Sequence, residues 1–213
     1  VEGEHSPDML AAIPCGVQTG AGAVINTFKV RAGDALAVFG AGAVGLSAVM
    51  AGHLVGASPL IALDMIEDRL DLALDLGATH VINTKEDDTK ARIREIIPKG
   101  VQFSLETTSN EQAFHDAIHC LGMGGVCGIV TTPIAGRKFP FTPQGLLNRG
   151  ATLRGIIQGS AIPNTFLPKL IALNREGRFP YGRLITTYHF SEINRAFEDS
   201  RSGRAVKPVL IMK

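Results

Sequence analysis

The sequence predicts an α/β protein built on a doubly wound parallel sheet. One observation is the short, continuous apolar run ALAVF at 35–39, which is typical of a strand buried on both faces. Another is the alternation of strand-like and helix-like segments over most of the chain. A third is the run GAGAVG at 40–45, placed where the apolar strand ends and a helix begins. Repeated strand–helix units of this kind form parallel sheets covered on both faces.

The expected elements follow one another in a regular order. We expect strands at 35–39, 60–64, 80–83, 101–106, 125–130 and 151–157. Helices are expected at 16–28, from about 44, and at 67–76, 89–97 and 110–121, with Gly77 ending the third of them. Pro133, Pro140 and Pro143 interrupt the alternation and predict a loop with a short helix near 144–148.

The last quarter of the chain is expected to belong to a second structural unit. It contains a helix near 165–175, a strand near 184–190, a helix over 191–201 capped by Ser191, and a final strand at 209–212. These elements do not extend a doubly wound sheet in a natural way.

Composition excludes several classes of protein. Of 213 residues, 45% are hydrophobic and 19% charged, which suits a packed core and argues against disorder. The net charge of +1 predicts neither a nucleic-acid partner nor an anionic membrane partner. Three cysteines without a CxxC pair argue against a disulfide framework and indicate a reducing compartment, so we expect a cytoplasmic protein.

One apolar stretch, 35–63, imitates a membrane span. It contains no charged residue apart from His53, which is usually neutral, and it carries a GxxxG pattern from Gly52 to Gly56. Glycines and Pro59 interrupt it, however. A buried strand, a helix and a second buried strand explain the same residues, so we expect no membrane partner.

The glycines of GAGAVG predict a dinucleotide-binding turn. Gly40 permits a tight turn, Gly42 lets a pyrophosphate approach the backbone, and Gly45 lets helix and strand pack closely. With Val44 they open a helix whose N-terminal N–H groups favour phosphate. Asp64 closes the next strand 19 positions after Gly45, where an acid that binds the adenosine ribose is expected. The alternative is a packed strand–helix turn without a ligand.

Asp64 also favours NAD over NADP, because a carboxylate accepts hydrogen bonds from both ribose hydroxyls and repels a 2′-phosphate. Arg69, five residues further on, is a candidate for the adenosine ribose or a phosphate. The alternative for Arg69 is an exposed helix arginine paired with Glu67 or Asp68.

Other polar candidates carry weaker signals. His115 and His119 are four apart on a helix, but HDAIH lacks the Glu of HExxH, so a solvated helix face is the better interpretation. Cys120 and Cys127 flank a Gly-rich turn and are expected to be inert core thiols. Cys15 lies outside any apolar strand, and its spacing alone gives little support for a metal role.

The segments PCGVQTGAGA at 14–23, GAGAVG and LDM resemble the zinc-dependent, medium-chain alcohol dehydrogenases, and CGVQTGAGAV is most similar to the aryl- and benzyl-alcohol branch. Matching segments cover nearly the whole chain: FSLETT at 103–108, GGVCGIV at 124–130, LRGIIQG at 153–159 and SGRAVKPVL at 202–210. The resemblance implies a Rossmann domain and the following catalytic and cofactor-binding residues: Cys15 as a catalytic zinc ligand, Thr19 on the nicotinamide side, Val130, Thr131 and Gln158 lining the nicotinamide pocket, and Lys207 near the pyrophosphate.

The chain also departs from this family. The family has a preceding catalytic domain that supplies further zinc ligands, and alcohol dehydrogenase is the known example of a Cys₂His catalytic zinc site. No such segment is present here. We therefore expect 1–15 to be a remnant of the catalytic domain, 16–157 to be the NAD-binding Rossmann domain, and 158–213 to be a segment returning to the catalytic domain.

The resemblance implies a parent enzyme that uses NAD and zinc to oxidise a small-molecule, aromatic alcohol to its aldehyde. Three alternatives remain open: a noncatalytic NAD-binding module, a methyltransferase, and a zinc-free quinone reductase relative. Relatives form dimers or tetramers, and 151–157 reads as an unprotected edge strand, so we expect a homodimer or homotetramer.

Overall fold

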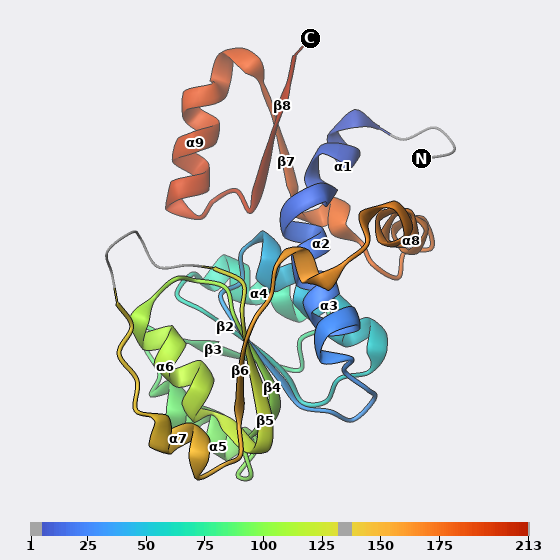
Figure 1. Cartoon of the computed structure of the whole chain (residues 1–213). Coiled ribbons are helices and arrows are strands. Elements are labelled where there is room, and N and C mark those ends of the chain that lie inside the picture. Colours follow the sequence, from blue (N-terminus) through green and yellow to red (C-terminus); the bar gives the residue numbers. More distant parts are fainter. Residues whose placement is uncertain (1–5, 132–137, 213) are drawn as a thin grey trace.

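The computed structural model describes residues 6–131 and 138–212. Pro133, which entered the sequence analysis, lies outside these ranges. Six strands form one sheet, with bounds β1 Leu36–Phe39, β2 Leu60–Asp64, β3 His80–Asn83, β4 Val101–Glu106, β5 Leu121–Ile129 and β6 Thr152–Gly155. Their order is β3-β2-β1-β4-β5-β6, and every neighbouring pair is parallel. The predicted doubly wound Rossmann sheet is confirmed (Figure 1).

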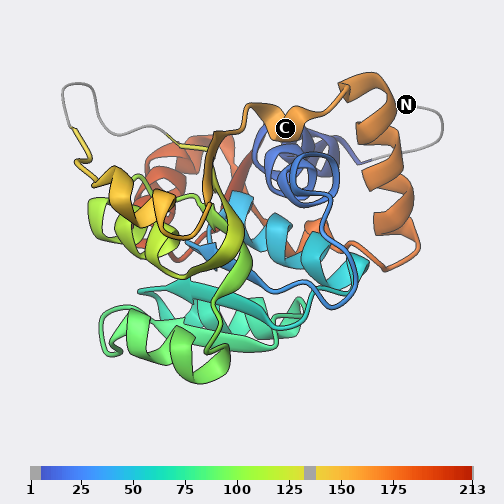
Figure 2. The same ribbon diagram turned by 60° about the horizontal axis from the view of Figure 1, so that its bottom comes forward.

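Helices cover both faces of this sheet (Figures 1 and 2). Alternate residues of β1 belong to two separate clusters: Leu36 and Val38 pack with α3 (Ala43–Val55), while Ala37 and Phe39 pack with α6 (Glu111–His119). The first face also carries α4 (Glu67–Asp75), and the second carries α5 (Thr89–Ile96) and α7 (Pro143–Leu147). This alternation explains why β1 and β2 are buried along their whole length.

A long helical segment precedes the sheet. It runs without a break from Pro7 to Phe28, as α1 (Pro7–Ala12), a wide π-type stretch (Ile13–Val17), α2 (Gln18–Gly22) and a second wide stretch (Ala23–Phe28). The predicted helix began only at residue 16. Pro14 is tolerated because it lies at the start of the wide stretch, where the regular hydrogen-bond ladder is relaxed.

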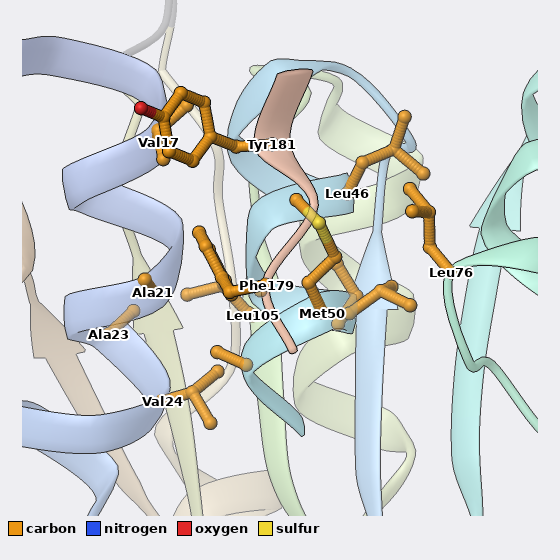
Figure 3. Close-up of a cluster of buried hydrophobic side chains, with 14 of the residues drawn as sticks. Val17, Ala21, Ala23, Val24, Leu46, Met50, Leu76, Leu105, Phe179 and Tyr181 are labelled. Atoms are coloured by element: carbon orange, nitrogen blue, oxygen red, sulfur yellow. The ribbon is translucent and has the colours of Figure 1, made fainter. Parts of the chain in front are cut away.

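This segment forms part of the larger hydrophobic core. Val17, Ala21 and Val24 face α3, and Phe179 and Tyr181 from the C-terminal part fill the same space (Figure 3). Its length and apolar composition would also suit a membrane span, but 61% of its most apolar window is buried inside the protein. The stretch 35–63, which imitates a span in the sequence, divides into β1, α3 and β2.

The end of the chain forms a small sheet of its own, the C-terminal unit. After α8 (Pro163–Arg175), β7 (Ile185–His189) and β8 (Lys207–Ile211) pair in parallel as a separate two-stranded sheet, with α9 (Ile193–Ser202) connecting them (Figure 1). The predicted cap at Ser191 is wrong. A short 3-10 turn precedes α9, and the His189 side chain accepts from the backbone N–H of Ser191 while Glu192 accepts from the backbone N–H of His189.

One strand is longer than predicted. The glycines at 122–125 were expected to form a turn leading into a strand at 125–130, but β5 already begins at Leu121. Gly124 adopts a φ of 70°, and the register between β4 and β5 shifts between Val101 and Phe103. The glycines thus form an irregularity inside the strand rather than a turn before it. The remaining predicted strands and helices are present with small shifts at their ends.

Candidate cofactor site

The Gly-rich turn joins β1 to α3 in the conformation that the motif predicts. Gly40 has a φ of 96°, and a Cβ there would lie 2.5 Å from Thr107 Oγ1. A Cβ on Gly45 would overlap the carbonyl oxygen of Gly40. A Cβ on Gly42, in contrast, would have no heavy atom of the described residues within 4 Å. Gly40 and Gly45 are therefore required by the fold itself, whereas the space beside Gly42 is free for a ligand.

Asp64, at the end of β2, is 9% exposed and already holds this turn. Its Oδ2 accepts from the backbone N–H of Ala41 at 2.6 Å, and its Oδ1 accepts from the N–H groups of Met65 and Ile66 at 2.7 and 3.1 Å. The two halves of the dinucleotide fingerprint are thus in direct contact. Each carboxylate oxygen can accept more than one hydrogen bond, which leaves capacity for ribose hydroxyls.

Arg69 lies on the first turns of α4 beside Asp64, with Nη1 4.0 Å from Asp64 Oδ2. Its Nε is buried and has no hydrogen-bond partner among the described residues. A Cβ on Gly203, in the turn between α9 and β8, would lie 3.5 Å from Arg69 Nη2. The guanidinium is therefore held between the Rossmann unit and the C-terminal unit, on the side of the turn where Asp64 lies.

The segment with Cys15 and Thr19 crosses the beginning of α3. A Cβ on Gly16 would lie 3.3 Å from Ala43 Cβ, and one on Gly20 would overlap the carbonyl oxygen of Val44. Thr19 is 7% exposed in this contact, while Cys15 is exposed. Two sequence segments that the resemblance treats as one site, 15–20 and 40–45, therefore lie side by side.

Three residues expected on the nicotinamide side lie at or just beyond the carboxyl ends of β5 and β6. Val130 and Thr131 follow β5, and Thr131 Oγ1 donates to Glu106 Oε2 at 2.9 Å. Gln158 Oε1 accepts from Gln18 Nε2 at 2.9 Å. Gln158 begins a turn in which three successive residues have φ between 50° and 63°. Asn26 Nδ2 donates to the carbonyl oxygen of Gly159 at 3.3 Å, and Thr27 Oγ1 donates to Ser160 Oγ at 2.9 Å. These two hydrogen bonds hold the left-handed turn against the N-terminal helical segment.

Glu106 and Gln18 are polar residues of this site that sequence reasoning missed. Glu106 is 1% exposed at the end of β4. Gln18 is 2% exposed, and its buried Oε1 has no hydrogen-bond partner in the part of the chain that the structure describes. An acid in FSLETT at the carboxyl end of a buried strand was a signal for Glu106. Gln18 carried no signal, because its partner lies 140 residues away.

Lys207 and the metal candidates are less closely tied to the turn. Lys207 is the first residue of β8, half-buried and paired in register with Ile185. Within the described residues, no group of three or more His, Cys, Asp or Glu side chains could hold a metal ion. Cys15 therefore offers one metal ligand and, in this part of the chain, no complete site.

The remaining candidates behave as structural groups. His119 Nδ1 contacts the carbonyl oxygen of His115 at 2.7 Å, and His115 Nε2 lies 3.9 Å from Glu111. Cys120 and Cys127 are buried, and burial raises the pKa of both thiols, that of Cys127 to about 11. Both are thus protonated and unreactive at neutral pH, as expected for core thiols.

Several known proteins resemble the chain over almost its full length. A geraniol dehydrogenase of Castellaniella defragrans is 40% identical over 205 residues, which cover 96% of this chain and 55% of the relative. The structure of a benzyl alcohol dehydrogenase from Acinetobacter calcoaceticus is 42% identical, with a TM-score of 0.96, and matches 100% of this chain and 59% of its own. An alcohol dehydrogenase zinc-binding domain protein from Burkholderia ambifaria is 47% identical, with a TM-score of 0.95 over 99% of this chain and 57% of its own.

The chain thus spans a little over half the length of these relatives. The sequence profile of one family, described as zinc-binding dehydrogenase, matches residues 43–174, from the Gly-rich turn to α8. This range begins inside the Gly-rich turn, after Gly40 and Gly42, and contains Gly45, Asp64, Thr131 and Gln158. The sequence profile and the relatives together show that the chain belongs to the zinc-binding dehydrogenase family.

Proposed function

We propose that the chain is the NAD(H)-binding portion of an oxidoreductase that oxidises an alcohol, an aryl alcohol above all, to its aldehyde. The observation that carries this proposal is the contact between Asp64 and the Gly-rich turn, beside the free space at Gly42. Parallel α/β sheets bind ligands where the strand order reverses, which here is between β1 and β4. The turn lies at that point.

Different residues of the chain would bind different parts of the cofactor. The N–H groups at the start of α3, near Val44, would bind the pyrophosphate, with Lys207 as a further basic group. Asp64 would accept the adenosine ribose hydroxyls, with Arg69 beside it. Thr19, Val130, Thr131 and Gln158 would orient the nicotinamide. A bound nicotinamide ring supplies the carbon that accepts hydride from the alcohol.

Zinc belongs to this proposal only through Cys15. A catalytic zinc site has three protein ligands and one open position, and the described residues offer one exposed thiol without partners of the right type nearby. The described residues therefore do not make a zinc site by themselves. In the whole protein, Cys15 would be one ligand, and the others would come from outside the described residues.

The alcohol is proposed to be aromatic because CGVQTGAGAV is most similar to that branch and because a structure 42% identical to the chain is a benzyl alcohol dehydrogenase. The 40% identical relative is named a geraniol dehydrogenase, which favours an allylic alcohol as the second candidate. In both substrates the carbon that carries the hydroxyl is bonded to an unsaturated carbon. We propose a cytoplasmic enzyme that forms a homodimer or homotetramer.

Ligand binding tests the cofactor part of this proposal. NADH fluorescence should be enhanced on titration with the chain, and S-adenosylmethionine should not displace NADH. Displacement would favour the methyltransferase alternative. Turnover by the whole protein then separates an alcohol dehydrogenase from a noncatalytic NAD-binding module, and loss of that turnover with Cys15→Ser separates it from a zinc-free quinone reductase relative.

A further inference from the structure

Glu106 occupies a special position in the sheet. It is the last residue of β4, and its register partners are Phe39 at the end of β1 and Ile129 at the end of β5. The strand order reverses between β1 and β4. Glu106 therefore lies at the carboxyl edge of the sheet, where the strands diverge and a ligand crevice opens.

Its two carboxylate oxygens bind two different loops. Oε1 accepts from the backbone N–H groups of Thr108 and Ser109 at 2.6 and 3.1 Å, and from Thr108 Oγ1 at 2.5 Å. Oε2 accepts from Thr131 Oγ1 at 2.9 Å. One carboxylate thus joins the loop after β4 to the residue that follows β5.

The loop after β4 is itself part of the Gly-rich turn's surroundings. Thr107 Oγ1 donates to the carbonyl oxygen of Phe39 at 2.7 Å, and a Cβ on Gly40 would touch both Thr107 and Thr108. The position of Thr131 is therefore set relative to the phosphate-binding turn through a short chain of contacts. That chain runs from Gly40 through Thr108 and Glu106 to Thr131.

A buried carboxylate has a high cost unless hydrogen bonds replace its hydration. Glu106 is 1% exposed, and no ion pair among the described residues includes it. The register partners of Glu106 at the ends of β1 and β5, Phe39 and Ile129, are both hydrophobic. An acid at this position is therefore better explained by the two loops that it holds than by packing.

We propose that Glu106 is a positioning residue for the nicotinamide half of the cofactor, acting through Thr131. This inference rests on the proposed function, because it takes Thr131 as part of the nicotinamide pocket. The adenosine half depends on Asp64 and its own hydrogen bonds to Ala41 and Ile66. Loss of the Glu106–Thr131 hydrogen bond should therefore weaken one half of the site and spare the other.

The test compares two ligands on five variants of the chain. NADH contains both halves of the cofactor, whereas ADP-ribose lacks the nicotinamide. Glu106→Gln and Thr131→Val should each weaken NADH binding about 10-fold, the size of losing a hydrogen bond to a charged group, and change ADP-ribose binding by less than about 3-fold. Thr131→Ser keeps the hydroxyl and should restore NADH binding to within about 3-fold of the unmodified chain.

Asp116→Asn is the matched control, because Asp116 is also a buried acid, 6% exposed, but binds Gln112 on α6. It should leave both ligands unaffected. The double variant of Glu106 and Thr131 should lose no more NADH affinity than either single variant, because both changes break the same Glu106–Thr131 hydrogen bond. Thr131→Val carries the test if Glu106→Gln fails to fold.

The possible failures are distinguishable. If the unmodified chain does not bind NADH, the proposed function is overturned and the inference with it. If the unmodified chain binds NADH, but Thr131→Val either has no effect or weakens ADP-ribose as much as NADH, only the inference is overturned. Failure of Thr131→Ser to restore binding would likewise show that the hydroxyl is not the group that matters.

Discussion

Asp64 Oδ2 accepts a hydrogen bond from the backbone N–H of Ala41 at 2.6 Å, so the acid that ends β2 also fixes the Gly-rich turn that follows β1. Any change at Asp64 therefore has two consequences. Loosening of the turn should weaken NAD and NADP alike, because both have the same pyrophosphate. Loss of the ribose acceptor and of the charge should affect the two cofactors in opposite directions.

The first prediction follows from this separation. Asp64→Ser or Asp64→Gly should narrow the difference in binding free energy between NAD and NADP by about 1–3 kcal/mol, the scale of losing charge-assisted hydrogen bonds. Calorimetry with both cofactors measures that difference. The control is Asp75→Ser, which removes an exposed acid that pairs with Arg183. It should leave the difference between NAD and NADP binding unchanged. Equal binding of NAD and NADP by the unmodified chain would contradict the prediction.

The glycines of the turn should separate binding from stability. Gly42→Ala should fold normally, because Gly42 has a φ of −81° and free space where the Cβ would lie, yet it should weaken NADH binding by filling that space. Gly45→Ala should lower the free energy of unfolding by about 1–3 kcal/mol, since its Cβ overlaps the backbone of Gly40. Thermal unfolding and NADH titration on both variants check this. Equal losses of stability would show that Gly42 is structural too.

Sequence alone predicted the parts of this site that depend on local pattern. The apolar run at 35–39, the glycines at 40–45 and the acid at 64 lie close in sequence, and each is determined by a strand end or a turn. Glu106 could not be assigned a role in this way. Its partner Thr131 lies 25 residues away and reaches it only because β4 and β5 pair in parallel.

The helix at the beginning of the chain illustrates a second limit. The prediction placed the helix start at residue 16, but the helical segment begins at Pro7 and contains Pro14, a residue that normally breaks a helix interior. Tertiary packing overrides that signal, because Ile13 and Val17 are both buried in the core with α3 and hold the chain helical on both sides of Pro14. Cys15 thereby lies within a helix, on an exposed part of it.

The C-terminal unit should lose local stability in acid. A hydrogen bond from Arg204, followed by one from Tyr188, holds the pKa of Asp199 below its ordinary value of 3.8. A carboxyl with a lowered pKa in the folded state adds stability above its unfolded pKa, and this stability is lost as the pH falls through the folded value. Asp199→Asn should therefore speed hydrogen exchange in β7 and β8 at pH 7.

The difference between Asp199→Asn and the unmodified chain should shrink as the pH falls below 3.8. Glu198→Gln on the same helix is exposed and is the control, with no expected change in exchange. A difference that stays constant down to the lowest pH at which the unit is folded would show that the charge of Asp199 is not the stabilising feature.

Self-association is expected through the predicted strand at 151–157. β6 (Thr152–Gly155) is the last strand of the sheet and pairs only with β5 among the described strands. No described strand pairs with its outer edge, and Ile157 beyond it is 85% exposed. Sedimentation at micromolar concentration should show at least a dimer. Leu153→Pro, which disrupts the edge strand, should shift the distribution of species toward monomer. A monomeric unmodified chain would contradict the prediction.

The chain of 213 residues should bind NAD but not oxidise alcohol by itself. The dinucleotide turn, Asp64 and the nicotinamide-side residues all lie within it, so binding should survive. A catalytic zinc needs three protein ligands, and each missing ligand removes part of a binding energy on the order of 10–16 kcal/mol for complete structural sites. Cys15 alone, exposed and with no metal-binding cluster in the described part of the chain, should not retain zinc through dialysis. Without the metal the alcohol is not polarised, and hydride transfer lacks both positioning and electrostatic stabilisation.

Metal analysis after dialysis and NADH formation with benzyl alcohol, measured on one preparation, check both statements. Cys15→Ser is the control and should change neither result. Stoichiometric zinc together with steady turnover would show that the chain holds a complete catalytic site.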